Sequence, residues 1–122
     1  MTNMTNMAKP EWECTHYEEF KEEIIPGPEG LSERVIARVP GTNVATRILH
    51  MAPGTDTSAN GVQNHDFWEE LIILEGSYID LGLNQEFSAG SVACRPPGMK
   101  HGPFKSPNGC KVYEVRYYAK GQ

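Results

Sequence analysis

The stretch from Gln63 to Gly76 reads Gln-Asn-His-Asp-Phe-Trp-Glu-Glu-Leu-Ile-Ile-Leu-Glu-Gly, and it decides the fold predicted for this chain. At the two-residue period of a β-strand, one face carries first polar and then apolar side chains. The residues on this face are Gln63, His65, Phe67, Glu69, Leu71 and Ile73. A polar cluster followed by core residues on the same face is typical of a site built inside a β-barrel.

The two-residue period of a strand places the two adjacent carboxylates of this stretch on opposite faces. Glu69 shares its face with Leu71 and Ile73, whereas Glu70 lies on the opposite face. A carboxylate that faces a core without a partner is costly. We therefore predict that Glu69 points inward and binds a metal, and that Glu70 faces solvent or an interface.

Turn signals every 8 to 12 residues divide the chain into about eight short strands. This spacing predicts a β-sandwich or a small barrel. The absence of a βαβ spacing of about 30 residues argues against a parallel sheet. Besides the opening stretch, strands are expected at 34–39, 44–51, 77–81, 86–87, 91–95 and 111–118.

The N-terminal part of the chain is expected to lie outside the strand pattern. Residues 1–10 are predicted to form a disordered tail, and 11–122 a single barrel domain. Residues 12–25 are acidic and aromatic, and their pattern fits either a short helix over 15–23 or an extended strand that covers the barrel. The segment 26–30, Pro-Gly-Pro-Glu-Gly, is a break.

Composition excludes several classes of function. The chain has 122 residues and a formal net charge of −5, and no run of Lys and Arg exceeds two residues. Nucleic-acid and anionic-membrane partners are therefore not expected. No apolar run approaches the roughly 20 residues that span a bilayer. The polar N-terminus lacks the features of a signal peptide, so a cytoplasmic protein is expected.

Cysteine usage points to the same compartment. The three cysteines, Cys14, Cys94 and Cys110, form no Cys-x-x-Cys pair. A zinc ribbon or a thioredoxin-type motif is thereby excluded. We expect free and mostly buried thiols in a reducing compartment.

Four residues form a candidate metal site. Gln63, His65 and Glu69 occur at even intervals, and His101 follows the turn Pro-Pro-Gly, from which a jelly-roll connection can return it to the same cavity. Two histidines and one carboxylate make a facial triad with open positions. Gln63 is a fourth, neutral ligand or orients a bound water. Such donors suit Fe(II), Mn(II), Ni(II) or Zn(II).

The spacing of these residues resembles the two signature motifs of the cupin superfamily. Gly90, five residues, Pro96-x-Gly98, two residues and His101 match the second motif, and Glu69, six residues and Gly76 match the end of the first. The short gap between His65 and Glu69 is similar to the anti-sigma-factor type of cupin and to the related acetylacetone dioxygenases. Gln63 stands where the family most often has a third histidine.

The resemblance implies a cupin jelly-roll barrel (a double-stranded β-helix), usually a homodimer, with one divalent transition metal. It implies that His65, Glu69 and His101 are ligands and catalytic residues. The expected activity is on a small enolisable carbonyl compound, either by dioxygenase-type C–C cleavage or as a non-redox isomerase, lyase or cyclase. The alternative is a metal- or ligand-binding sensor without catalysis.

Further residues are assigned to the cavity by their parity. Each of three sets offers two alternatives on opposite faces of a strand, so that only one of the two can face the cavity. The expected role of each of these residues is ordinary core packing. These sets are Arg47 or His50, Phe67 or Trp68, and Tyr113 with Tyr117 or Glu114 with Arg116.

Overall fold

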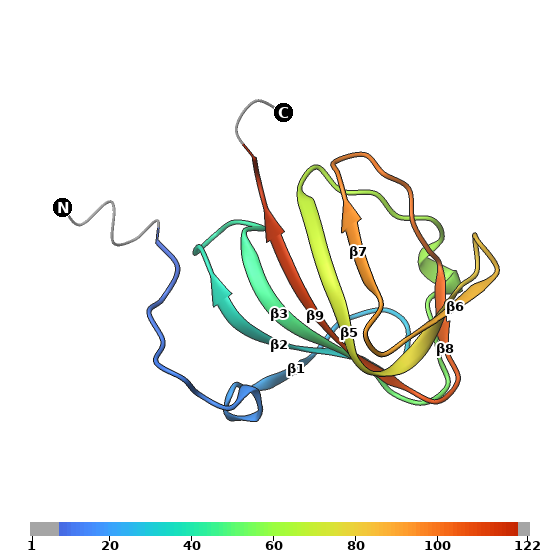
Figure 1. The fold of residues 1–122 in the computed structure, drawn as a ribbon, viewed down its shortest axis with the longest axis horizontal. Helices are drawn as coiled ribbons and strands as arrows, with labels where there is room; N and C mark the ends of the chain where they lie inside the picture. Colours follow the sequence, from blue (N-terminus) through green and yellow to red (C-terminus); the bar gives the residue numbers. More distant parts are fainter. Residues whose placement is uncertain (1–7, 120–122) are drawn as a thin grey trace.

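The computed structural model describes residues 8–119 as an all-β protein with nine strands and two 3-10 turns (Figure 1). Residues 1–7, most of the expected N-terminal tail, lie outside the described part. No α-helix occurs within 8–119. The elements are η1 (Tyr17–Glu19), β1 (Glu22–Ile24), β2 (Leu31–Arg38), β3 (Ala45–Met51), β4 (Thr55–Asp56), η2 (Ser58–Asn60), β5 (Trp68–Asp80), β6 (Gln85–Ser88), β7 (Val92–Arg95), β8 (Phe104–Ser106) and β9 (Cys110–Tyr117).

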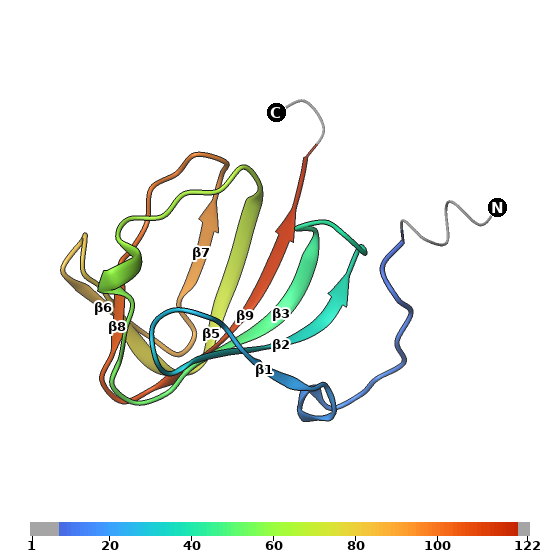
Figure 2. The ribbon, with the colours of Figure 1, turned by 180° about the vertical axis from the view of Figure 1, so that it is seen from behind.

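The strands form one curled antiparallel sheet. Its order is β1-β2-β3-β9-β5-β8-β4, and β6 and β7 both pair with β5. Every strand pair is antiparallel. The sheet is strongly curled, so that β2 and β8 lie on opposite sides of the view (Figures 1 and 2). The expected all-β barrel is therefore confirmed.

Strand β5 holds the two parts of the sheet together. Its first half pairs with β9 and β7, and its second half pairs with β6 and β8. At the change of partners stands Gly76, with φ +75°. A Cβ atom there would lie 2.1 Å from the carbonyl oxygen of Gly109. Glycine is required because both the backbone conformation and this close approach exclude a side chain.

The hydrophobic core lies on the concave face of the sheet. It follows the period predicted for the opening stretch, since Phe67, Leu71 and Ile73 are all buried. The cluster continues with side chains from β2, β3, β5 and β9, namely Leu31, Leu49, Met51, Tyr78, Cys110 and Val112. Burial of this face fixes the register of β5, because a slip by one residue would turn every side chain to the other face.

The N-terminal segment runs beside β2 along one edge of the sheet (Figure 2). It contains the turn η1 and the short strand β1, so neither a helix over 15–23 nor a continuous cover strand is formed. Lys9 donates a hydrogen bond to Thr46 Oγ1 at 3.2 Å. The indole nitrogen of Trp12 donates one to the carbonyl of Ile36 at 2.8 Å.

Some elements differ from the predicted ones. Strand β2 begins at Leu31 rather than at residue 34, and β4 and β8 were not predicted. Strands of two and three residues are too short to show a hydrophobic period.

The prediction of mostly buried thiols is wrong, because Cys14 and Cys94 are exposed and only Cys110 is buried. Cys14 lies outside every helix and strand, and Cys94 stands on β7 opposite the exposed Glu70.

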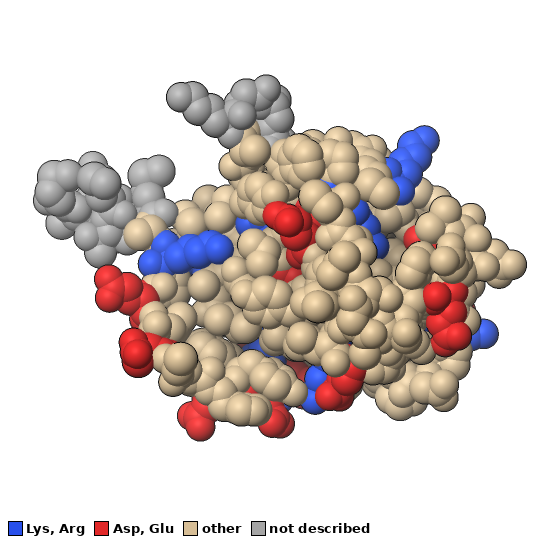
Figure 3. Space-filling model, viewed as in Figure 1, with Lys and Arg blue, Asp and Glu red and all other residues tan. Residues whose placement is uncertain are grey.

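Figure 3 shows no extended basic area on the face that it draws. Among the described residues, no helix has the length and apolar character to cross a membrane. On the face drawn in Figure 3, Lys and Arg side chains lie in separate small groups. This distribution agrees with the formal net charge of −5.

Candidate metal centre

Three of the predicted ligands meet at one end of the curled sheet. His65 lies on the segment that leads into β5, Glu69 on β5, and His101 on the connection between β7 and β8. One potential ligand atom from each lies within 4.8 Å of the other two. The two imidazole rings are 5.0 Å apart between centroids. The structure thus brings together residues that are up to 36 positions apart in the sequence.

Backbone hydrogen bonds hold the two histidine-bearing segments together. In the turn that precedes His101, the backbone N–H of Met99 donates to the carbonyl of Pro96, and that of Gly98 donates to the carbonyl of His65. Gln63 and His101 exchange two backbone hydrogen bonds, of 2.8 and 2.9 Å. Directly opposed residues of an antiparallel pair project to the same side. Gln63 therefore lies beside His101, as the fourth-ligand prediction requires.

Glu69 is the buried carboxylate of the site, with 3% of its surface exposed, and Glu70 is exposed. The parity prediction is confirmed. Glu69 does have protein partners, however: Arg95 donates to Oε1 at 2.9 Å and Arg116 to Oε2 at 3.2 Å. Burial alone would raise the pKa of Glu69, but the charges of Arg116 and Arg95 outweigh it and lower that pKa.

The surroundings of both histidines favour the neutral form of the imidazole. Burial lowers the pKa of His65 and of His101, and the charge of Arg95 lowers that of His101 further. His65 stacks on the ring of Phe67, with centroids 4.6 Å apart and an interplanar angle of 8°. The Nδ1 atom of His101 lies 3.2 Å from the carbonyl oxygen of Met99. A neutral imidazole is the form that coordinates a metal.

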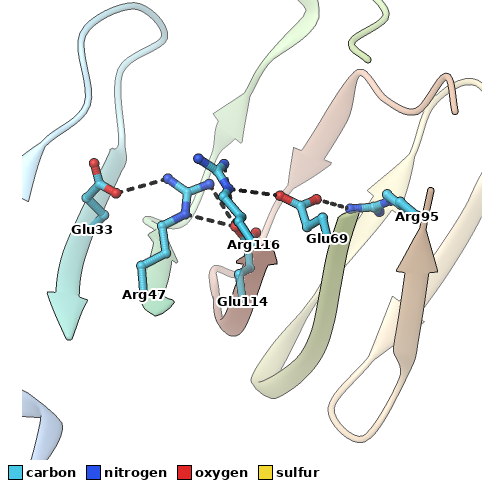
Figure 4. A network of polar contacts seen from close by, with 6 residues as sticks. All are labelled: Glu33, Arg47, Glu69, Arg95, Glu114 and Arg116. Atoms are coloured by element: carbon cyan, nitrogen blue, oxygen red, sulfur yellow. Dashed lines mark hydrogen bonds and ion pairs between the residues drawn. The ribbon is translucent and has the colours of Figure 1, made fainter. Parts of the chain in front are cut away.

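A row of six charged residues crosses the concave face of the sheet (Figure 4). Acidic and basic residues alternate along the row, which spans five strands. Neighbouring residues form ion pairs with N–O distances of 2.8–3.8 Å. Cross-strand register produces the row, because Glu69 stands directly opposite both Arg95 and Arg116. The order is Glu33, Arg47, Glu114, Arg116, Glu69 and Arg95.

A cavity of about 420 Å³ opens beside the site. His101 and Arg95 line it, together with the polar residues Asp80, Ser91 and Lys100. Most other lining side chains are apolar, including Leu71, Phe87 and Met99. A cavity of this size suits a small organic molecule.

The structure also shows which residue of each set of cavity candidates lies on the inner face of the sheet. Arg47 joins the inner row, whereas His50 lies on the outer side with its Nδ1 3.5 Å from a Glu22 oxygen. Glu114 and Arg116 face inward, and Tyr117 lies on the outer face. Phe67 is buried on the inner side.

Arg95 was not predicted from the sequence. Its signal is its position: it lies on the strand before the Pro-Pro-Gly turn, six residues ahead of His101. Even intervals place it on the same strand face as Ala93, which packs against the core. That parity alone identifies Arg95 as an inward cation. Its pairing with Glu69 follows only when the register of β5 and β7 is known.

Comparison with known proteins identifies the fold. No protein-family model and no curated protein sequence matches the chain. Among solved structures, an RmlC-like cupin from Shewanella frigidimarina is 19% identical, covering 91% of this chain and 95% of its own, with a TM-score of 0.68. An acetylacetone dioxygenase from Acinetobacter johnsonii is 15% identical, covering 92% of this chain and 79% of its own, with a TM-score of 0.67.

A third similar structure is a regulatory complex. A chain in the complex of Rhodobacter sphaeroides SigE with the anti-sigma ChrR is 16% identical to this chain, with a TM-score of 0.61. The match covers 84% of this chain and 52% of that one. At these identities the likeness concerns the fold. The chain has the cupin fold, and the resemblance predicted from the two motifs is confirmed at that level.

The donor set fits a divalent transition metal. Two neutral imidazoles and an ionised carboxylate converge, and an amide residue lies next to them. A carboxylate has about four acceptor positions, so Glu69 can bind a metal while it accepts its two arginine hydrogen bonds. The same arginines reduce the negative charge available to a dication. The residues therefore provide the ligands, and the charge row weakens the attraction.

Proposed function

We propose that this protein is a metal-dependent cupin enzyme that acts on a small enolisable carbonyl compound. The observation that carries this proposal is the convergence of His65, Glu69 and His101. His101 also lines a cavity whose walls are mainly apolar. Fe(II), Zn(II), Mn(II) and Ni(II) all accept such a set of donors. The dioxygenase among the similar structures supports the choice of substrate class.

In this proposal, His65, Glu69 and His101 hold the metal and Gln63 contributes its amide. The bound metal would supply a Lewis acid for a carbonyl oxygen. The apolar walls exclude water from the substrate, and this strengthens the interactions of the charged groups that line the cavity. The backbone bond pair between Gln63 and His101 keeps the two loops at a fixed separation.

The test begins with elemental analysis of the purified protein beside its Gln63→His variant. We expect about one metal per chain in the wild type. If the wild type holds no stoichiometric metal while the variant gains one, the proposal is wrong for this chain. Anaerobically iron-loaded protein is then offered a panel of diketones in an oxygen electrode. Oxygen uptake supports C–C cleavage, and product formation without uptake supports an isomerase, lyase or cyclase.

A second candidate function is a metal- or ligand-responsive sensor. The observation that favours it is the pairing of Glu69 with two arginines, which gives the carboxylate a stable state without a metal. The similarity to a chain of an anti-sigma complex supports the same reading. A thermal stability that depends on metal, with no turnover of any substrate tested, would favour the sensor over the enzyme.

We also propose a cytoplasmic homodimer. Two exposed thiols, on Cys14 and Cys94, suit a reducing compartment. On the outer face of the sheet, Ile72 and Tyr113 stand opposite each other in register and are 38% and 37% exposed. An Ile72→Glu substitution is expected to convert a dimer to a monomer in light scattering, and a monomeric wild type would refute the dimer.

A further inference from the structure

The charge row has two unlike ends. Arg47 is paired with Glu33 and Glu114, and Arg116 is paired with Glu69 and Glu114. Within residues 8–119, Glu69 is the only carboxylate paired with Arg95. The alternation therefore begins with a carboxylate, at Glu33, and ends with a guanidinium. The guanidinium end is the one that lines the cavity.

Arg95 is buried and held in place at that end. It is 8% exposed, and its Nη1 donates to Glu69 while its Nη2 lies 3.4 Å from the Tyr78 hydroxyl. Its guanidinium carbon lies 5.5 Å from the ring centroid of Phe104. A guanidinium has five N–H donors, so these two contacts leave donors for a ligand. A buried cation that shares its only carboxylate with a second arginine favours an additional anion.

The rest of the cavity contains no competing buried cation. Lys100 also lines it but is exposed. The buried carboxylate of Asp80 lines it too, and its Oδ1 accepts hydrogen bonds from the backbone N–H groups of Gly82 and Leu83. Leu71 and Phe87 are among the apolar side chains that form the walls. The cavity thus presents one buried arginine in a mainly apolar lining, together with the buried carboxylate of Asp80.

We infer that Arg95 binds a delocalised oxyanion of the ligand, a carboxylate or an enolate, carried on a small apolar body that fills the cavity. A planar guanidinium matches two oxygens that share one negative charge. The inference rests on the proposed function because it concerns the same site, and it adds the charge and shape of the substrate. It excludes cations and sugar-like polar molecules as ligands.

The test uses metal-free protein, prepared with a chelator, and isothermal titration calorimetry. Benzoate, benzamide and benzamidine have nearly the same shape and are an anion, a neutral molecule and a cation. We expect benzoate to bind at least about tenfold more tightly than benzamide, a difference of about 1.4 kcal/mol. Benzamidine should not bind measurably. Equal affinities, or a preference for benzamidine, would overturn the inference.

A second pair of probes separates the two oxyanions. 1,3-Cyclohexanedione is ionised as its enolate at neutral pH, and cyclohexanone is a neutral molecule of similar size. Preference for the dione over cyclohexanone identifies an enolate site. Preference for benzoate without preference for the dione identifies a carboxylate site. Failure of both preferences rejects Arg95 as an anion-binding residue.

Variants connect the preference to Arg95. Arg95→Gln should abolish the preference for benzoate, and Arg95→Lys should retain part of it because the charge stays while the planar donor pair is lost. Lys100→Gln removes the exposed cation of the same cavity and should leave the preference unchanged. If Lys100→Gln abolishes it and Arg95→Gln does not, the inference is wrong. Circular dichroism checks that each variant is folded, and the wild-type comparison holds even where a variant is unstable.

These results are independent of the metal. An anion preference in metal-free protein supports Arg95 even if elemental analysis finds no metal and the enzyme proposal fails. Conversely, a stoichiometric metal without any anion preference leaves the enzyme proposal standing and rejects only the role of Arg95.

Discussion

Two neighbouring carboxylates on β5 have opposite surroundings. Glu69 lies on the concave face, buried between two guanidiniums and next to two histidines. Glu70 lies on the convex face, exposed, with one hydrogen bond of 2.6 Å from the Tyr117 hydroxyl. The two residues have the same side chain and lie on the same strand. The difference shows that the face of the sheet, rather than the residue type, determines whether a carboxylate belongs to a site.

The two faces also differ in how their charges are connected. On the concave face, the four central charges of the row each pair with two neighbours, so removal of one of them breaks two ion pairs. On the convex face, the contacts of Glu70 and His50 are separate pairs at the surface. Water solvates such pairs when a partner is lost. The inner face is therefore the sensitive one.

The largest expected effect comes from Glu69→Gln. It leaves Arg95 and Arg116 without their shared carboxylate, and breaking a buried ion pair costs about 3–5 kcal/mol. Glu70→Gln is the matched control on the same strand, and it should change the free energy of unfolding by no more than about 0.5 kcal/mol. Denaturant unfolding of metal-free protein measures both. Equal losses for the two variants would contradict the difference between the faces.

The next effect concerns the histidines of the two faces. His101→Ala removes a proposed ligand and should weaken metal binding by at least about 100-fold. Loss of a residue that only hydrogen-bonds a metal ligand already lowers metal affinity by about 10- to 100-fold. His50→Ala removes the histidine of the outer face and should leave metal affinity unchanged. Competition with a chromophoric chelator gives both constants. Similar affinities for the two variants would mean that the metal binds elsewhere.

A smaller effect is expected when the inner charges around Glu69 are removed together. A triple variant with Glu69→Leu, Arg95→Met and Arg116→Leu leaves no unpaired member of that group. Replacement of a buried charge cluster by apolar residues is often neutral, so stability should return to within about 2 kcal/mol of the wild type. Denaturant unfolding should rank it above Glu69→Gln. If it is the less stable of the two, the charges stabilise the fold by themselves.

The smallest effect is confined to one group on the outer face. The hydrogen bond to Glu70 raises the pKa of Tyr117 to about 12. Glu70→Gln should return this pKa toward the ordinary value of about 10, because the phenol no longer donates to a carboxylate. NMR of the tyrosine ring carbons during alkaline titration follows the change, and Tyr117→Phe identifies the signal. A titration that stays high in Glu70→Gln would assign the shift to another cause.

Much of the fold followed from local patterns. Alternation placed Phe67, Glu69 and Leu71 on one face, and turn residues divided the chain into most of its strands. Glycine spacing marked the turn before His101. It also marked Gly76, which was expected to end a strand but lies within β5, where the strand changes partners. These features depend on the backbone period and on turn chemistry, which neighbouring residues specify.

The charge row could not be predicted from such patterns. Its pairs join residues such as Arg47 and Glu114, which are 67 positions apart and stand opposite each other in β3 and β9. Pairing of this kind depends on strand order and register, which a single sequence does not display. The sequence therefore located the carboxylate of the site and the two histidines. It offered Arg116 only as one of two alternatives, and it missed Arg95.

The place of β9 in the sheet has a consequence for folding. Strand β9 follows all the other strands in sequence, yet it lies between β3 and β5 and contributes Glu114 and Arg116 to the row. During synthesis, β3 and β5 therefore remain without their shared neighbour until Cys110–Tyr117 has left the ribosome. Such non-local pairing slows folding and exposes unpaired strand edges. In the nascent chain, Arg47 and Glu69 therefore lack the residues that lie between them in the charge row. The addition of β9 joins β3 to β5 and completes the charge row in the same step.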